Sequence, residues 1–179
     1  TTVGKDLVIK SDPGEASTDS VFSVNAKDGS NLMNVRADGI VTKPYQVSWC
    51  SNRVGESDLE GTQIITWNPS PDHNIGSAMN TSNDRFTCPV AGRYQFYCHS
   101  MGNGGTTTVD RELTLKVNGS YINYTSYSSG GDSSPTHHLF NCFNVILNLD
   151  ANDYVEFWNR QGGMIYSDRY AVGFITLVG

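Results

Sequence analysis

One β-strand pattern constrains this chain more than any other feature of its sequence. The segment from Phe86 to His99 turns at Pro89 and Gly92 and then alternates between two sets of side chains. Because successive side chains of a strand point to opposite faces, this alternation predicts a half-buried strand. One face would carry Tyr94, Phe96 and Cys98, and the other Arg93, Gln95, Tyr97 and His99.

The chain after Pro44 continues this pattern of short strands and turns. No segment has the apolar period of a helix, and Asn118-Gly119 indicates a tight hairpin. The polar stretch from Asn68 to Arg85 is expected to be a loop. Strands at this spacing predict an all-β sandwich or jelly roll of about ten strands. The other expected strands are Gln46–Cys50, Ile64–Trp67, Leu113–Val117, Tyr121–Tyr127, Leu139–Leu149, Tyr154–Trp158 and Ala171–Val178.

Residues 1–43 differ from the rest of the chain in composition. They are expected to form a short β-hairpin stem before a head over residues 44–179. The stem holds short apolar runs and two turns, Asp28-Gly29 and Asp38-Gly39. Each turn is expected to be a tight reversal with positive φ at both central positions. Because Phe22 is its only aromatic residue, the stem cannot bury a core of its own. It must pack on another surface, and copies of itself are the simplest candidate.

The residues Phe86–Phe96 read Phe-Thr-Cys-Pro-x-x-Gly-x-Tyr-x-Phe, which resembles the signature of the globular head of complement C1q. That head belongs with the tumour necrosis factor jelly rolls, and the resemblance runs from about Tyr45 to Gly179. In this sequence no Gly-x-y triplets of a collagen stalk accompany the head, in contrast to complement proteins. The other ordered matches are Gln46–Trp49, Ile64–Asn68, Leu115–Gly119, Leu147–Val155 with Asn152 in place of glycine, and Gly173-Phe174.

The resemblance implies a trimer of jelly rolls that meet around a threefold axis. Aromatic side chains exceed what one small sandwich must hide, so some are expected at the trimer interface and others in the core. The alternative is that all of them serve the core of one subunit. These residues are Tyr94, Phe96, Tyr154, Phe157, Trp158, Tyr170 and Phe174.

The stem resembles the short repetitive strands that precede the tips of bacteriophage fibres and spikes. Its segments Val24–Gly29 and Val35–Gly39 echo each other, and each ends in an Asp-Gly turn. The alternative is an ordinary N-terminal hairpin that docks on the head.

Polar loops bordered by tyrosines are candidates for ligand binding. Loops rich in Ser and Gly beside Tyr have the composition of adaptable recognition surfaces, although the same composition also makes ordinary loops. The candidate contacts are Tyr124, Tyr127, Ser128, Asp132 and His137.

The sequence contains no catalytic or metal-binding pattern. It has no Gly-x-Ser-x-Gly elbow and no spacing typical of a triad, a zinc site or a calcium loop. His137 and His138 would point to opposite faces of a strand, and His99 is expected to be packed or hydrogen-bonded. We therefore expect a protein that is not an enzyme, with no metal and no cofactor. The alternative, which the resemblance implies for some family members, is calcium held by loop carboxylates.

Charge and cysteine content restrict the partners. The formal net charge is −6 and the basic residues are scattered, which argues against nucleic acid and anionic membranes. No apolar run approaches the roughly 20 residues of a membrane-spanning helix, so membrane insertion is not expected.

The four cysteines lack Cys-x-x-Cys spacing and are expected to be buried free thiols, with one disulfide as the alternative. They are Cys50, Cys88, Cys98 and Cys142.

Together these features predict the trimeric head of a viral fibre or spike, with a bacteriophage as the preferred source. The head would lie on the virion exterior and bind a host cell-surface receptor or glycan multivalently. Its N-terminal side would meet other virion proteins. The alternatives are a structural head that only nucleates and caps the trimer, and a secreted, lectin-like C1q-domain protein of a cellular organism.

Overall fold

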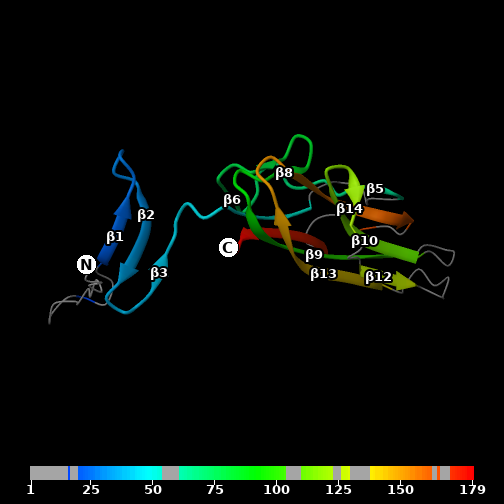
Figure 1. Cartoon of the computed structure of the whole chain (residues 1–179). Helices are drawn as coiled ribbons and strands as arrows, with labels where there is room; N and C mark the ends of the chain where they lie inside the picture. The colour runs from blue at the N-terminus through cyan, green and yellow to red at the C-terminus, as the bar shows by residue number, and fades with distance from the viewer. Residues whose placement is uncertain are drawn as a thin grey trace, which may run out of the picture. The chain divides into compact units, whose positions relative to one another are not determined.

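Strands β1 to β15 build the described part of the chain (Figure 1). A computed structural model describes residues 16, 20–53, 61–103, 110–122, 126–129, 138–162, 165 and 170–179. The chain divides into two compact units, residues 1–46 and residues 47–179. A search of the described residues finds no helix with the length and apolar character needed to cross a membrane.

The N-terminal unit is a three-stranded antiparallel sheet in the order β1 (Ser20–Asn25), β2 (Asn31–Arg36) and β3 (Val41–Thr42). Its two Asp-Gly turns are built alike, but the prediction of positive φ at both central positions is wrong. Only Gly29 and Gly39 have positive φ, at 85° and 82°. In each turn the residue before the loop donates its N–H to the carbonyl four residues later and accepts from the N–H of the glycine, as in a type I turn followed by a left-handed glycine.

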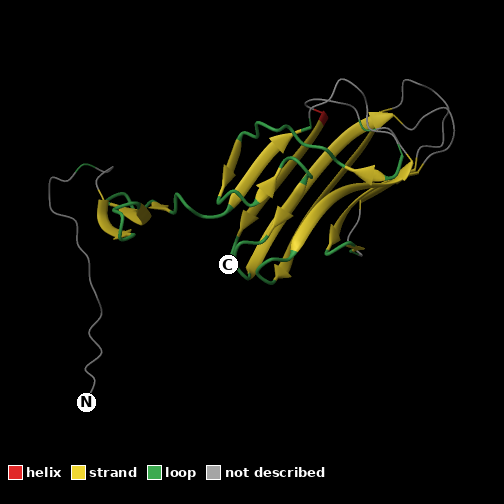
Figure 2. Ribbon diagram, turned by 90° about the horizontal axis from the view of Figure 1, so that it is seen from above, coloured by secondary structure: helices red, strands yellow, loops and turns green. Residues whose placement is uncertain are grey.

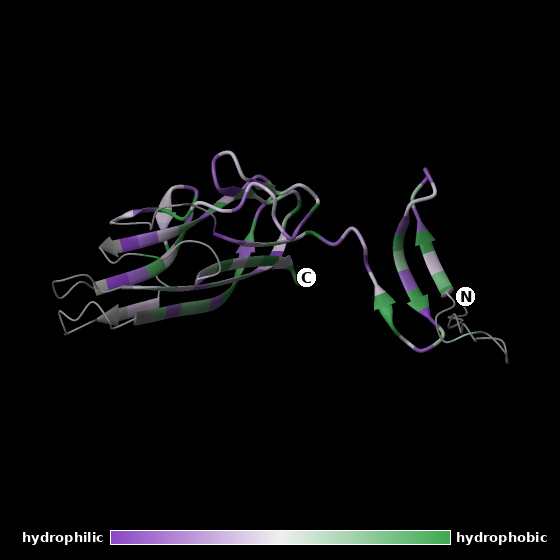
Figure 3. Cartoon of the chain, turned by 180° about the vertical axis from the view of Figure 1, so that it is seen from behind, coloured by the Kyte–Doolittle hydropathy of each residue, from purple (hydrophilic) through white to green (hydrophobic). Residues whose placement is uncertain are grey.

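This small sheet has one apolar face and no buried residue. Direct cross-strand pairs place five apolar side chains on the same face, and Figure 3 shows hydrophobic segments on its strands. None of the described residues between 20 and 46 is buried in the single chain. The apolar face consists of Phe22, Val24, Met33, Val35 and Val41.

The C-terminal unit, called the head, is a sandwich of two antiparallel sheets (Figures 1 and 2). The inner sheet has five strands in the order β13 (His138–Leu149), β9 (Gly92–Asn103), β15 (Ala171–Leu177), β4 (Ser48–Asn52) and β6 (His73–Ile75). The outer sheet has seven strands. Five follow the order β11 (Ser120–Tyr121), β10 (Asp110–Val117), β14 (Tyr154–Gly162), β8 (Arg85–Thr87) and β7 (Met79–Asn80), while β12 (Ser126–Ser129) pairs with β10 and β5 (Gln63–Ile64) pairs with β14.

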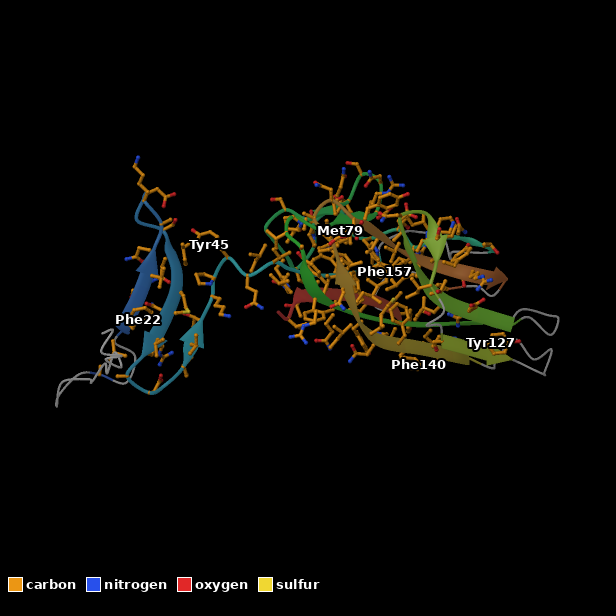
Figure 4. The ribbon with its side chains drawn as sticks, in the orientation of Figure 1. Phe22, Tyr45, Met79, Tyr127, Phe140 and Phe157 are labelled. Atoms are coloured by element: carbon orange, nitrogen blue, oxygen red, sulfur yellow. The ribbon has the colours of Figure 1, made fainter. Side chains whose placement is uncertain are left out.

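An aromatic core fills the space between these sheets. The alternation predicted for β9 is confirmed, because Tyr94, Phe96 and Cys98 are all fully buried. Phe157 of β14 lies among the core side chains (Figure 4), with its ring centroid 5.3 Å from that of Trp67 and 6.3 Å from that of Phe96. Such edge-to-face contacts add to the free energy of apolar burial.

Gly173 of β15 is required by the close approach of two tryptophans. A Cβ atom at this position would lie 2.7 Å from Trp67 Cη2 and 2.8 Å from Trp49 Cζ3. We expect Gly173→Ala to lower the free energy of unfolding by about 1–3 kcal/mol, since the two buried rings must shift to admit the methyl group. Urea unfolding followed by tryptophan fluorescence measures the change, and an unaltered midpoint would contradict this packing.

Most expected strands are present, with differences where short segments pair. The predicted strand Tyr121–Tyr127 is replaced by the separate strands β11 and β12, and the predicted loop Asn68–Arg85 contributes β6 and β7. Ile65 and Trp67, expected in a strand, are buried but lie outside any strand, beyond β5. The head therefore has more strands than the ten expected, because two- and three-residue pairings carry little sequence signal.

Two turns contain Asn residues in the left-handed conformation, and the first confirms the hairpin predicted at Asn118-Gly119. Asn118 and Gly119 have φ of 50° and 81°, as a two-residue hairpin between β10 and β11 requires. Asn152 has a φ of 74° and takes the left-handed conformation for which glycine is favoured.

The two ends of the head differ in character. The chain enters and leaves at one end, where the Leu177 N–H donates to the Val47 carbonyl at 3.0 Å. The opposite end is called the far end. It is marked by the pairs Asn103–His138 of β9 and β13, Asp110–Ser129 of β10 and β12, and Arg111–Gly162 of β10 and β14. There the interior is polar, since buried Arg111 donates from Nη2 to Ser100 Oγ at 2.9 Å and buried Asn141 donates to the Ser126 carbonyl at 3.1 Å.

Candidate self-association face

The inner sheet turns one face to the core and the other, called the association face, to solvent. Pairing registers align side chains of the association face in rows that cross up to five strands. Phe140 and Ile146 of β13 are 59% and 57% exposed, and Phe140 can be followed in Figure 4. The rows are Met101–Phe140; Asn52–Val172–His99–Cys142; His73–Cys50–Phe174–Tyr97–Asn144; Ile75–Ser48–Thr176–Gln95–Ile146; and, at the edge, Arg93–Asn148.

The composition of the association face is that of an interface. Aromatic and aliphatic side chains hold its middle, and Ser, Thr, Asn and Gln surround them. Among the described residues of these rows the one Asp, Glu, Lys or Arg is Arg93, which is exposed at the edge of the face. Depletion of charge with aromatic enrichment distinguishes the centre of a protein interface from ordinary surface. The same chain places Arg, Lys and Glu on the solvent face of the outer sheet, so the scarcity of charge is specific to one side of the sandwich.

His99 occupies the middle of this face and is packed and hydrogen-bonded, as expected. Its ring stacks on Phe140 with centroids 5.7 Å apart and planes 26° apart. Its Nδ1 lies 3.2 Å from the Tyr97 hydroxyl. Burial lowers the pKa of the His99 imidazole and, with Cys142 and Cys98 nearby, raises the pKa of Tyr97. The neutral forms of both side chains are therefore favoured on this face.

The lowered pKa of His99 predicts a loss of stability in acid. The unfolded chain takes up a proton near the ordinary pKa of 6.5, while the folded chain does so only at lower pH. The contribution of His99 is thus fully present above that value and is lost as the pH falls through the folded pKa. Between about pH 7.5 and about pH 5.5 the parent chain should lose more stability than His99→Gln. Chemical unfolding at several pH values tests this, and parallel profiles would contradict it.

The cysteines are free thiols, but they do not all lie in the core. Cys88 and Cys98 are buried, whereas Cys50 is half-buried and Cys142 is exposed. Burial raises the pKa of Cys88 to about 12, so this thiol stays protonated and unreactive at neutral pH. The expectation of burial is wrong for Cys142, because it pairs across the sheet with His99 on the association face rather than with Cys98.

The residues predicted for the trimer interface or core fall into three places. Tyr94, Phe96 and Phe157 are fully buried within the single head. Tyr154, Trp158 and Tyr170 are half-buried, the first two on the solvent face of the outer sheet. Phe174 lies on the association face. What these seven residues do in a trimer stays a prediction.

The association face contains residues that the sequence reasoning did not select. They include Tyr97, Phe140, Ile146 and Val172. Their signal was available in the alternation, because they occupy the opposite parity to the core residues of the same strands. The sequence did not reveal that strand pairing gathers the aromatic and aliphatic side chains of this second parity on one face of the sheet.

The predicted ligand-binding residues lie mostly outside the described residues. This applies to Tyr124, Asp132 and His137, while Ser128 is placed only as a backbone position of β12. Tyr127 is described and is 57% exposed on β12 (Figure 4). No group of three His, Cys, Asp or Glu side chains suited to a metal ion occurs among the described residues.

The two sheets and their strand order define the head as a C1q/TNF-type β-sandwich. No family model and no curated protein matches the sequence. The globular domain of a zebrafish complement 1qA protein matches with a TM-score of 0.59 and 19% identity, over 75% of this chain and 98% of that one. Murine APRIL at pH 5.0 matches with a TM-score of 0.53 and 14% identity, over 73% of this chain and 99% of that one. At these identities the likeness establishes the fold alone.

Proposed function

We propose that this chain forms a homotrimer and serves as the non-enzymatic binding head of a fibre or spike on a virion, with a bacteriophage as the preferred source. Domains with the C1q/TNF fold usually trimerise and typically bind rather than catalyse. The observation that carries the proposal is the aromatic association face of the inner sheet, where charge is confined to Arg93 at the edge among the described residues. Three copies that meet through this face would remove Phe140, Ile146 and Phe174 from water.

The N-terminal unit supports a fibre-like assembly. Its apolar face, Phe22 to Val41, has no buried residue in the single chain. A three-stranded sheet with one apolar face needs a second layer to be stable. In the proposed trimer, the three copies of this sheet bury their apolar faces against one another and form the stem.

The far end of the head supports a binding role. The ends of β12 and β13 that flank Asp132 and His137 lie there, at Ser129 and His138, opposite to the end where the chain enters the head at Val47. Loops held by a rigid sandwich are common positions for recognition. Three equal weak sites on one axis would raise the avidity for a host surface by about 10²–10⁴-fold.

The mass of the full chain in solution tests the assembly. Sedimentation or native mass spectrometry should give three times the 19.6 kDa of one chain, and the trimer should persist on dilution to nanomolar concentration. A stable monomer would contradict the proposal, and a dimer would contradict the threefold arrangement.

A panel of bacterial cells tests the binding role separately. The trimer labelled with a fluorophore should attach to some strains, and the double substitution Tyr124→Ala with Tyr127→Ala should abolish attachment while the mass stays that of a trimer. If attachment is unchanged in this variant, the loop residues are not the receptor site. If no strain is bound while the trimer is stable, the purely structural, capping role is favoured.

A further inference from the structure

The solvent face of the outer sheet gathers three cations that are far apart in the sequence. The pairing register aligns Arg85 of β8, Glu156 of β14, Lys116 of β10 and Tyr121 of β11 in one row. Neighbouring strands are about 4.8 Å apart, so a short path across the sheet passes all four residues. Arg160 of β14 joins them, with its guanidinium carbon 4.7 Å from the centroid of the Tyr121 ring. We call these residues, with Glu112, Tyr154 and Trp158, the outer cluster.

Aromatic rings and buried carboxylates hold the cations in place. Arg85 donates from Nε and Nη2 to Glu156 Oε1 at 2.9 and 2.7 Å, and its guanidinium lies over Tyr154. Trp158 Nε1 donates to Glu156 Oε2 at 2.9 Å. Arg160 Nη1 donates to Glu112 Oε1 at 3.0 Å. Both carboxylates are thereby engaged, and both Glu side chains are buried.

Lys116 differs from the two arginines because it has no anionic partner among the described residues. Its Nζ lies 3.5 Å from the centroid of Trp158 and 4.4 Å from that of Tyr121, and those two rings are nearly perpendicular. Rings stabilise a cation through their π faces, but they leave its three N–H donors available to other acceptors. The ammonium is thus fixed in position with its donors unused.

The balance of charge at the outer cluster is opposite to that of the chain. Three cations and two carboxylates leave a net charge of +1, on a chain whose formal net charge is −6. The side chains of Arg85 and Arg160 remain 40% and 42% exposed. Lys116 and Arg160 contact the same ring, that of Tyr121, so both cations are within reach of one saccharide chain.

We propose that the outer cluster binds an acidic saccharide, with one sulfate or carboxylate group of the sugar on Lys116 and another on Arg160. The half-buried rings of Tyr121 and Trp158 hold Lys116 and Arg160 over their faces, so the sugar would meet the cations rather than these ring faces. Sugars space their charges by whole rings, which suits isolated cations separated across strands. Nucleic acid carries a charge about every 1.7 Å of duplex, and a single excess positive charge on an acidic chain fits it poorly.

The site lies within one chain, so it does not depend on the proposed trimer. A monomer that binds acidic saccharides through Lys116 would contradict the trimer and leave this site intact. A trimer that ignores them would contradict this site and leave the assembly intact.

Biolayer interferometry with the full chain tests the proposal on three immobilised probes: heparin for sulfate, polygalacturonate for carboxylate and dextran as the neutral control. The parent chain should bind one or both acidic probes and not dextran. Lys116→Gln should weaken binding by about tenfold or more, as the loss of a charged hydrogen bond implies. Lys116→Arg should retain binding. Lys43→Gln, at an exposed position outside the head, removes the same charge and should leave binding unchanged.

The outcomes separate the sources of the anionic group. Binding to heparin alone assigns a sulfate, and binding to polygalacturonate alone assigns a carboxylate. No binding to either probe overturns the proposal, as does an equal loss in Lys43→Gln, which would indicate diffuse attraction. A single-stranded oligonucleotide that competes more strongly than both saccharides, and loses binding in Lys116→Gln, would overturn the assignment to sugar.

Discussion

Phe157→Ala is expected to lower the free energy of unfolding of the head by about 3–5 kcal/mol, the cost of a large cavity in a packed core. The ring of Phe157 is fully buried. Its neighbours are the rings of Trp49, Trp67, Phe96 and Phe143, at centroid distances of 6.1, 5.3, 6.3 and 6.1 Å. Three of these side chains come from the inner sheet and Trp67 from the segment after β5, and they cannot all move inward to fill the space. A loss of this size is a large part of the roughly 5–15 kcal/mol that stabilises a domain.

Urea unfolding at fixed protein concentration measures the loss, because two of the neighbours of Phe157 are tryptophans whose fluorescence reports the core. Val90→Ala is a suitable control, since Val90 is 48% exposed in a turn, and its effect should stay within about 0.5 kcal/mol. Equal midpoints for Phe157→Ala and the parent would show that the aromatic cluster does not hold the two sheets together.

The double substitution Phe140→Asp with Ile146→Asp is expected to convert the trimer to monomers while the head stays folded. Both side chains point to solvent in the single chain, so the substitutions remove no core contact. In the proposed trimer they would place six carboxylates in an interface whose described rows offer one cation per subunit, Arg93 at the edge, so most of these charges would be unpaired. Burying unpaired charges costs several kcal/mol each, which is enough to abolish assembly.

Sedimentation velocity should show the mass of one chain for this variant, with an unchanged far-ultraviolet circular dichroism spectrum. Thr87→Asp, an exposed position on the outer sheet, adds a carboxylate away from the association face and should remain trimeric. A variant that stays trimeric with both aspartates in place would rule out the association face as the contact between subunits.

The fold could be predicted from the sequence because alternation and turn residues act locally. Tyr94, Phe96 and Cys98 face the core as their spacing requires, and Asn118-Gly119 makes its hairpin because both residues accept positive φ. The Asp-Gly turns were harder, since the same dipeptide also fits a three-residue loop in which only the glycine is left-handed.

The association face and the outer cluster could not be predicted, because both depend on which strands become neighbours. Tyr97 and Phe174 are adjacent only through the pairing of β9 with β15. Arg85 and Lys116 are far apart in the sequence. They lie in one row because β14 pairs with both β8 and β10, and Glu156 of β14 is the register partner of both residues. A period of two assigns a side chain to a face, but strand order decides what surrounds it there.

The hydrogen bond that joins Leu177 to Val47 also has a practical consequence for protein engineering. Because the polypeptide starts and finishes the sandwich at adjacent points, the head is suited to insertion into a surface loop of an unrelated carrier with short connectors on both sides. A foreign peptide fused after Gly179 would likewise emerge at the end where the chain enters the head, and it would leave the far end unobstructed.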